Sequence, residues 1–150
     1  MPHTVFVYGT LRQGGVRAIP QLFPSARFIG FGTVKGWLYD FGAYPGLICD
    51  AAGRDIVGEV YDVDEAAVRE MDEIERYVEG KGNEAECYYF RRAHSIALRD
   101  GRTMTAELYE CNPKHYDCAM PMDATDWIAF ANTKGELPEE SWPDGAPIKK

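Results

Sequence analysis

One segment of the sequence, residues 26–40, most constrains what this chain can fold into. Large apolar and aromatic side chains recur through it in a strand-like alternation, and it also contains Gly30, Gly32 and Gly36. Glycines at this density inside a strand favour bulges or tight bends. The segment therefore predicts a small curled sheet or a barrel.

Four other segments carry strand patterns of β-branched, aromatic and alternating residues. Two of them are joined by Asp100-Gly101, which is typical of a hairpin turn. Pro45-Gly46 predicts another turn, followed by a short strand. The four predicted strands cover residues 5–7, 56–63, 88–98 and 103–110.

Helical patterns separate some of these strands. Residues 65–75 are rich in strong helix formers, and Asp64 is a suitable N-cap for them. A short helical turn is expected near residues 18–23. A second helix is expected over residues 123–133, where Gly135 can end it.

The totals place this chain among ordinary globular proteins. Its 150 residues fit one domain with its own core, and 45% hydrophobic and 27% charged residues are typical values. The net charge of −8 argues against a nucleic-acid partner, because 16 basic residues would have to build a basic face against 24 acidic ones. We expect one domain over residues 1–150, with a proline-rich tail from about residue 136.

The cysteines and the hydropathy pattern predict a cytoplasmic protein. None of the four cysteines belongs to a CxxC pair, no leader sequence precedes them, and no segment has the length of a membrane span. Cys111, His115 and Cys118 lie close in sequence, but a fourth ligand at suitable spacing is missing and Pro113 interrupts the group. The sequence therefore predicts reduced thiols, no membrane contact and no metal site.

The pattern of residues 5–12 predicts a buried strand that ends at Gly9. Gly9 allows a tight turn and lets main-chain N–H groups come close to a ligand. Thr10 adds a hydroxyl, and Arg12 adds a planar cation suited to a carboxylate. Two interpretations stay open, a ligand-binding loop or an ordinary strand-to-loop junction with a solvent-facing arginine.

The end of the helix over residues 65–75 carries a carboxylate on its apolar face. At about 100° per residue, Glu75 falls on the same side as Val68, Met71 and Ile74. Desolvation, neighbouring acids and the helix dipole would all favour its protonated form. Glu75 is therefore a candidate proton shuttle, unless it bends back to solvent from a frayed helix end.

Together these two motifs resemble the gamma-glutamyl cyclotransferase superfamily. Tyr8-Gly9-Thr10-Leu11 resembles the YG[ST]L loop of that family, and the stretch from Asp72 to Glu75 resembles its D-x-x-E. The remaining similarities are Gly58–Tyr61 before the helix, Tyr89-Phe90-Arg91 as a Y-x-R strand, Tyr109 in the next strand and the segment NTKGELP over residues 132–138.

The resemblance implies an α+β fold, a small mixed-sheet β-barrel with flanking helices and no cofactor. It implies release of 5-oxoproline from a small γ-glutamyl amine or γ-glutamyl amino acid, a lyase or acyltransferase reaction. The substrate's α-amino nitrogen would attack its own γ-carbonyl carbon, and Glu75 would act as general base and then as general acid. The implied substrate-binding residues are Tyr8, Gly9, Thr10, Leu11, Tyr89 and Tyr109.

Some alternatives remain open. The same fold could be a non-catalytic module that binds a small carboxylate or a protein, or it could remove a γ-glutamyl protecting group in a biosynthetic pathway. Arg76 replaces a small residue of the family and the loop over residues 76–86 is long, which leaves the leaving group and a lid role open. Arg12 and Arg91 could each bind a substrate carboxylate or be structural. We expect a monomer or homodimer.

Overall fold

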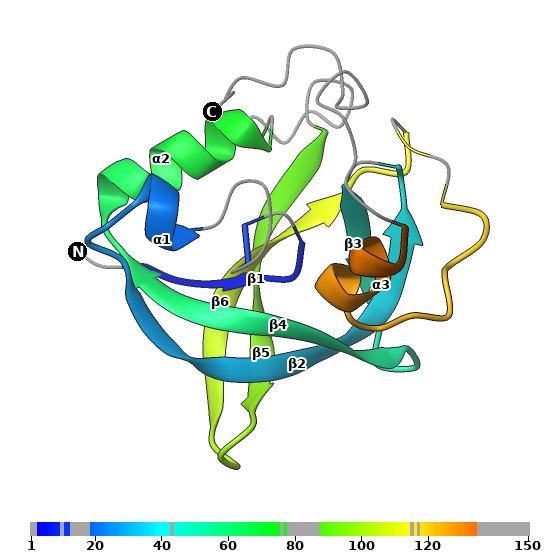
Figure 1. Cartoon of the computed structure of the whole chain (residues 1–150), viewed down its shortest axis with the longest axis horizontal. Coiled ribbons are helices and arrows are strands. Elements are labelled where there is room, and N and C mark those ends of the chain that lie inside the picture. The colour runs from blue at the N-terminus through cyan, green and yellow to red at the C-terminus, as the bar shows by residue number, and fades with distance from the viewer. Residues whose placement is uncertain are drawn as a thin grey trace.

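The computed structural model describes residues 3–9, 11–12, 19–42, 44–75, 77, 88–114, 116 and 118–134. Within these ranges the chain forms six strands and three helices (Figure 1). In chain order they are β1 (His3–Val7), α1 (Ile19–Leu22), β2 (Arg27–Asp40), β3 (Pro45–Cys49), β4 (Arg54–Val63), α2 (Glu65–Ile74), β5 (Tyr89–Leu98), β6 (Thr103–Cys111) and α3 (Trp127–Lys134).

The strands form a closed barrel. Their order is β3-β2-β4-β1-β6-β5, and an additional pairing of β2 with β5 closes the ring of β2, β4, β1, β6 and β5. β3 pairs with β2 beside the ring. The pairing of β1 with β6 is parallel and the others are antiparallel, so the sheet is mixed. The predicted mixed-sheet barrel with flanking helices is confirmed.

The glycines of β2 explain how the ring closes. The register of β2 against β4 shifts between Phe28 and Gly30, as expected for a bulge. Gly32 pairs with Leu98 of β5, and a Cβ on Gly32 would lie 2.9 Å from the carbonyl oxygen of Ala97. Only a residue without a Cβ allows β2 and β5 to approach this closely.

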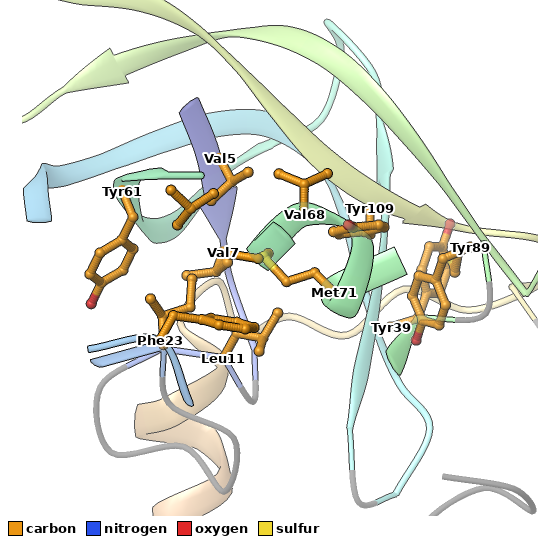
Figure 2. Packing of buried hydrophobic residues seen from close by; sticks show 14 residues of the cluster. Val5, Val7, Leu11, Phe23, Tyr39, Tyr61, Val68, Met71, Tyr89 and Tyr109 are labelled. Carbon is orange, nitrogen blue, oxygen red and sulfur yellow. The ribbon is translucent and has the colours of Figure 1, made fainter. Parts of the chain in front are cut away.

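Side chains on the two faces of the barrel wall form two cores. The first fills the barrel and includes Trp127 of α3, and the second lies between the wall and helices α1 and α2. Figure 2 shows Val68 and Met71 of α2 in this second cluster with Val7 of β1 and Tyr109 of β6. The main members of the barrel interior are Phe6, Tyr8, Val34, Leu38, Ile56, Val60, Ile96, Ala106, Leu108 and Trp127.

Helix α2 forms as its sequence predicts. The Asp64 carboxylate caps it by accepting a hydrogen bond of 2.8 Å from the main-chain N–H of Ala67. The helix ends one residue earlier than predicted, because Glu75 is its C-cap. The predicted apolar face is buried against the barrel wall, so the end of α2 is held at a defined place.

The predicted turn at Pro45-Gly46 is wrong, because both residues already belong to β3. The chain turns just before them, where the N–H of Phe41 donates to the carbonyl oxygen of Tyr44 at 3.0 Å and Gly42 has a φ of 101°. A Cβ on Gly46 would lie 2.3 Å from the Phe41 ring. Gly46 is therefore needed for packing rather than for a turn.

The predicted start of the last helix is also wrong, because α3 begins at Trp127 and not at residue 123. The carbonyl oxygen of Thr125 accepts a hydrogen bond of 2.9 Å from the N–H of Val57, so this part of the chain is bound to β4. The Asp126 carboxylate then accepts the N–H of Ala129 at 3.1 Å. Asp126 thus caps the N-terminus of α3.

Some predictions fall outside the described residues. These are the structure of Thr10, the loop over residues 76–86 apart from Tyr77, the place of His115 and the tail from about residue 136. Cys49, Cys111 and Cys118 are free thiols. In the part of the chain that the structure describes, no helix is long and apolar enough to cross a membrane.

Candidate active site

The loop after β1 is held against β3. The N–H of Arg12 donates to the carbonyl oxygen of Gly9 at 3.0 Å, which forms a turn. A Cβ on Gly9 would lie 2.6 and 2.8 Å from two ring atoms of Pro45, the first residue of β3. The close backbone approach predicted for Gly9 is therefore made to the protein itself. Leu11 is 4% exposed and its side chain packs in the outer core, so only its main chain could meet a ligand.

Three tyrosines gather beside this loop: Tyr8 directly after β1, Tyr89 of β5 and Tyr109 of β6. The Tyr8 hydroxyl donates to the carbonyl oxygen of Tyr109 at 2.6 Å, and the Tyr89 hydroxyl donates to that of Pro45 at 2.8 Å. The Tyr109 hydroxyl donates to Oδ1 of Asp72 at 2.6 Å. All three rings are buried. The structure thus brings Tyr8, Tyr89 and Tyr109 together with the end of α2, and each hydroxyl has a partner within the protein.

Glu75 is the C-cap of α2, and its charge acts on these tyrosines. Its N–H donates to the carbonyl oxygen of Met71 at 2.9 Å, so α2 is ordered up to this residue, and its side chain is half-buried. Burial raises the pKa of Tyr8, Tyr89 and Tyr109, and the negative charge of Glu75 raises each pKa further. The charge of Glu75 therefore acts on all three tyrosines.

Tyr116 belongs to the same group and was not predicted. Its ring stacks on Phe41 at a centroid distance of 4.3 Å and lies 5.5 Å from the Tyr89 ring. Burial, and to a lesser extent Tyr44 and Glu75, raise the pKa of Tyr116. The segment around Tyr116 has no periodic pattern, so the sequence contains no local signal for this placement.

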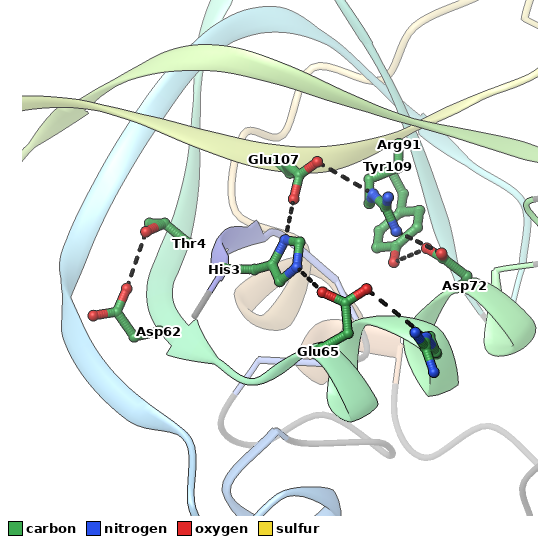
Figure 3. A network of polar contacts seen from close by, with 9 residues as sticks. His3, Thr4, Asp62, Glu65, Asp72, Arg91, Glu107 and Tyr109 are labelled. Carbon is green, nitrogen blue, oxygen red and sulfur yellow. Dashed lines mark hydrogen bonds and ion pairs between the residues drawn. The ribbon is translucent and has the colours of Figure 1, made fainter. Parts of the chain in front are cut away.

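Asp72 is a second residue beside the candidate site that was not among the predicted site residues. Beside the Tyr109 hydroxyl, its carboxylate binds Nη1 of Arg91, whose side chain is 5% exposed (Figure 3). Nε of Arg91 lies 3.2 Å from Oε2 of Glu107. Asp72 lies four residues after Val68, so the helical spacing that selects Glu75 could also have selected Asp72.

The same network continues to the start of α2 (Figure 3). The other oxygen of Glu107 lies 3.1 Å from Nδ1 of His3, and Nε2 of His3 lies 2.7 Å from Oε1 of Glu65. Glu65 stands in the first turn of α2 and Asp72 in the last. Polar contacts therefore fasten both ends of the helix that carries Glu75 to the barrel wall.

The His3 contacts predict a pH-dependent stability. The hydrogen bond to Glu65 is the main reason why the pKa of His3 lies above 6.5, and the same bond lowers the pKa of Glu65 below 4.5. The His3 contribution is complete below its unfolded-state pKa and is lost as the pH rises through the raised folded-state pKa. The Glu65 contribution is complete above its unfolded-state pKa and is lost as the pH falls through the lowered one.

We therefore expect His3→Gln to reduce the free energy of unfolding more at about pH 6 than at about pH 9, where less of His3 is protonated in wild type. Urea unfolding of both proteins at both pH values measures this difference. An equal loss at the two pH values would show that the charge of His3 contributes nothing.

Arg12 is buried and paired, so the solvent-facing interpretation is wrong. Its Nε lies 3.2 Å from Oε2 of Glu59, and its Nη1 lies 2.7 Å from Oδ1 of Asp126. Glu59 is 1% exposed and also accepts the Tyr61 hydroxyl at 2.8 Å. Like Arg91, Arg12 has carboxylate partners inside the protein, which favours a structural role for both arginines.

We expect Glu59→Ala to lower the free energy of unfolding by about 3–5 kcal/mol, because it leaves the buried guanidinium of Arg12 without one of its carboxylates. The double variant Arg12→Met/Glu59→Met should lose much less free energy of unfolding than the sum of the losses in Arg12→Met and Glu59→Met, since it leaves no buried charge unpaired. Urea unfolding tests both statements. Additive losses would mean that the ion pair is not coupled.

Comparisons with known proteins show the family of this chain. Residues 5–129 match the family model described as gamma-glutamyl cyclotransferase, AIG2-like. A Methanocaldococcus jannaschii protein named "Putative gamma-glutamylcyclotransferase" is 35% identical over 106 residues, which is 70% of this chain and 81% of that protein. A Vibrio cholerae protein of the same name is 42% identical over 77 residues, 50% of this chain and 64% of that protein.

A solved structure supports the fold separately. An AIG2-like protein from Mus musculus superposes with a TM-score of 0.65 at 24% identity, covering 83% of this chain and 88% of that one. The family model matches most of the present chain, and the alignment with the Methanocaldococcus jannaschii relative covers most of that protein. The chain belongs to the gamma-glutamyl cyclotransferase, AIG2-like family.

Proposed function

We propose that this protein releases 5-oxoproline from a small γ-glutamyl amine or γ-glutamyl amino acid. The observation that carries the proposal is the half-buried Glu75 at the end of α2, whose charge raises the pKa of three buried tyrosines beside the loop after β1. A half-buried carboxylate at the fixed end of a helix suits proton transfer. The names of the relatives point to the same reaction.

In the proposed mechanism Glu75 moves one proton. The α-ammonium group of the substrate cannot attack, so the Glu75 carboxylate first accepts a proton from it. The free amine then forms a bond to the γ-carbonyl carbon, which closes a five-membered ring. Glu75 returns the proton to the leaving nitrogen as the bond between that nitrogen and the γ-carbon breaks, and the ring nitrogen gives up its second proton to solvent. The products are 5-oxoproline and the free amine, and the balance requires no cofactor.

The loop after β1 would hold the oxygen atoms of the substrate. Main-chain N–H groups of Gly9, Thr10 and Leu11 are the proposed donors, with Thr10 assigned from the sequence alone. The packing of Gly9 on Pro45 supports this role, because a fixed backbone loses little freedom when it binds.

The tyrosines Tyr8, Tyr89 and Tyr109 would form the wall against which the substrate folds. Their hydroxyls are engaged by Tyr109, Pro45 and Asp72, which keeps the rings in place. Closing a five-membered ring requires a bent substrate, and rigid walls favour that bend through proximity and orientation.

The test is a panel of γ-glutamyl amines and γ-glutamyl amino acids incubated with the purified protein. Mass spectrometry should detect 5-oxoproline and free amine in equal amounts from at least one substrate, also after dialysis against a chelator. Release of glutamate instead of 5-oxoproline would indicate hydrolytic removal of a γ-glutamyl group. Saturable binding with no product would indicate a non-catalytic binding module. Either outcome contradicts the proposal.

A further inference from the structure

Three side chains that the proposed reaction does not use meet where β3 lies beside the end of β6 (Figure 1). They are Cys49 of β3, His94 of β5 and Glu110 of β6. One ligand atom from each, the Cys49 sulfur, a His94 ring nitrogen and a Glu110 oxygen, all lie within 4.8 Å of one another. Residues separated by 61 positions in sequence thus form one compact cluster.

The strand register places His94 and Glu110 on the same face of the β5–β6 ladder, four residues apart along it. In the β5–β6 ladder His94 is opposite Ala106, and Glu110 is opposite Phe90. Side chains that alternate along β6 place Glu110 on the same face as Ala106 and Leu108, which fill the barrel interior. Glu110 is 5% exposed, so its carboxylate is held inside the wall.

Existing hydrogen bonds orient the carboxylate. The N–H of Cys49 donates to Oε2 of Glu110 at 2.7 Å, and Nε2 of His94 lies 3.1 Å from Oε1. Cys49 and His94 therefore both contact the Glu110 carboxylate without a bound ion.

We propose that Cys49, His94 and Glu110 bind a divalent transition-metal ion of the zinc type. A thiolate, an imidazole and a carboxylate are ligands that Zn²⁺ accepts together, whereas Mg²⁺ and Ca²⁺ prefer oxygen ligands throughout. In a zinc site with bonds of about 2.0–2.3 Å the ligand atoms lie closer together than 4.8 Å, the largest separation allowed among these three atoms. The three side chains would therefore move slightly toward one another when the ion binds. Three protein ligands leave the fourth tetrahedral position for water.

Arg92 competes for the same carboxylate. Its Nη1 lies 3.2 Å from Oε1 of Glu110, and its guanidinium lies 4.6 Å from the centroid of the Phe90 ring. The Arg92 side chain is 53% exposed, so it can turn toward solvent at little cost when an ion takes its place. The ion must also displace the proton of the Cys49 thiol, whose pKa burial and Glu110 raise to about 12.

The ion would join β3 to the β5–β6 hairpin. β3 pairs with β2 in the sheet. It contacts β6 through the hydrogen bond from the N–H of Cys49 to the Glu110 carboxylate. A bound ion would have one ligand on β3, Cys49, and two on the hairpin, His94 and Glu110. An ion that binds only the folded protein raises the midpoint of thermal unfolding.

The experiment uses metal-free full-length protein titrated with Zn²⁺ in competition with a chromophoric chelator. Wild type should bind one ion per chain, and Cys49→Ser and His94→Gln should each weaken binding at least about tenfold. Co²⁺ should give a thiolate charge-transfer band in wild type that is lost in Cys49→Ser. Arg92→Ala should bind more tightly than wild type, because it removes the competing cation.

Matched controls separate this cluster from adventitious binding. Cys118→Ser and His3→Gln change a thiol and an imidazole elsewhere and should bind Zn²⁺ like wild type. Zn²⁺ should raise the unfolding temperature of wild type by several degrees and leave that of His94→Gln unchanged. Binding that survives both Cys49→Ser and His94→Gln, or the absence of a stoichiometric site, would overturn the proposal. These readouts do not involve 5-oxoproline, so the two proposals can fail independently.

Discussion

Replacing Glu75 with glutamine is expected to lower the rate of 5-oxoproline release by about 100-fold to 10,000-fold, the usual contribution of a general acid–base group. Glutamine has nearly the same shape and can still accept a hydrogen bond from the substrate amine, but it cannot take the proton. The loss should therefore appear in kcat, with a small change in KM. Steady-state kinetics on the best substrate of the panel measures both constants.

The control for this variant is Glu73→Gln. Glu73 lies two residues earlier on the exposed face of α2, so the same change of charge is made without touching the tyrosines. It should retain wild-type kcat, and both variants should unfold in urea near the wild-type midpoint. A Glu75→Gln enzyme with near-normal turnover would show that another group moves the proton.

The sequence predicts this part of the molecule well because the relevant signals are local. The glycines of β2, the cap at Asp64 and the spacing that buries Val68, Met71 and Ile74 each depend on neighbours a few residues away. The chain therefore specifies a curled sheet, the start of α2 and the inward face of its last turn without information from distant residues.

Long-range partners could not be predicted in this way. Arg12 finds Glu59 and Asp126, which are 47 and 114 positions away. An arginine after a glycine loop has the same local sequence whether it meets a ligand or a buried carboxylate. Only the barrel, which brings the end of β1 next to β4 and the start of α3, decides between these roles.

Packing can also reverse a strong local preference. Pro45-Gly46 is typical of a turn, yet in the structure Gly46 lies in β3 because the Phe41 ring and the sulfur of Cys111 leave no room for a Cβ. Tyr116 reaches the site from an aperiodic segment and is positioned by contacts with Phe41 and Tyr89. Neither contact has a counterpart in the sequence pattern.

The buried ion pair under the end of α2 leads to the second large expected effect. Asp72→Ala should lower the free energy of unfolding by about 3 kcal/mol, the lower end of the range for breaking a buried pair, because Glu107 still faces Arg91. Asp72→Asn keeps an acceptor for the Tyr109 hydroxyl and should lose less, about 1–2 kcal/mol. Urea unfolding near neutral pH measures both values.

Activity shows whether this pair also positions Glu75, which lies three residues further along the same helix. In Asp72→Asn, assayed well below its unfolding temperature, kcat should fall roughly 10-fold to 100-fold while KM stays close to wild type, because a small displacement of the general base slows proton transfer. Glu73→Ala is the matched control for helix propensity and should change stability by less than about 0.5 kcal/mol. If Asp72→Asn matched wild type in stability and in kcat, the ion pair would neither stabilise the fold nor position the base, and the end of α2 would be held by its apolar face alone.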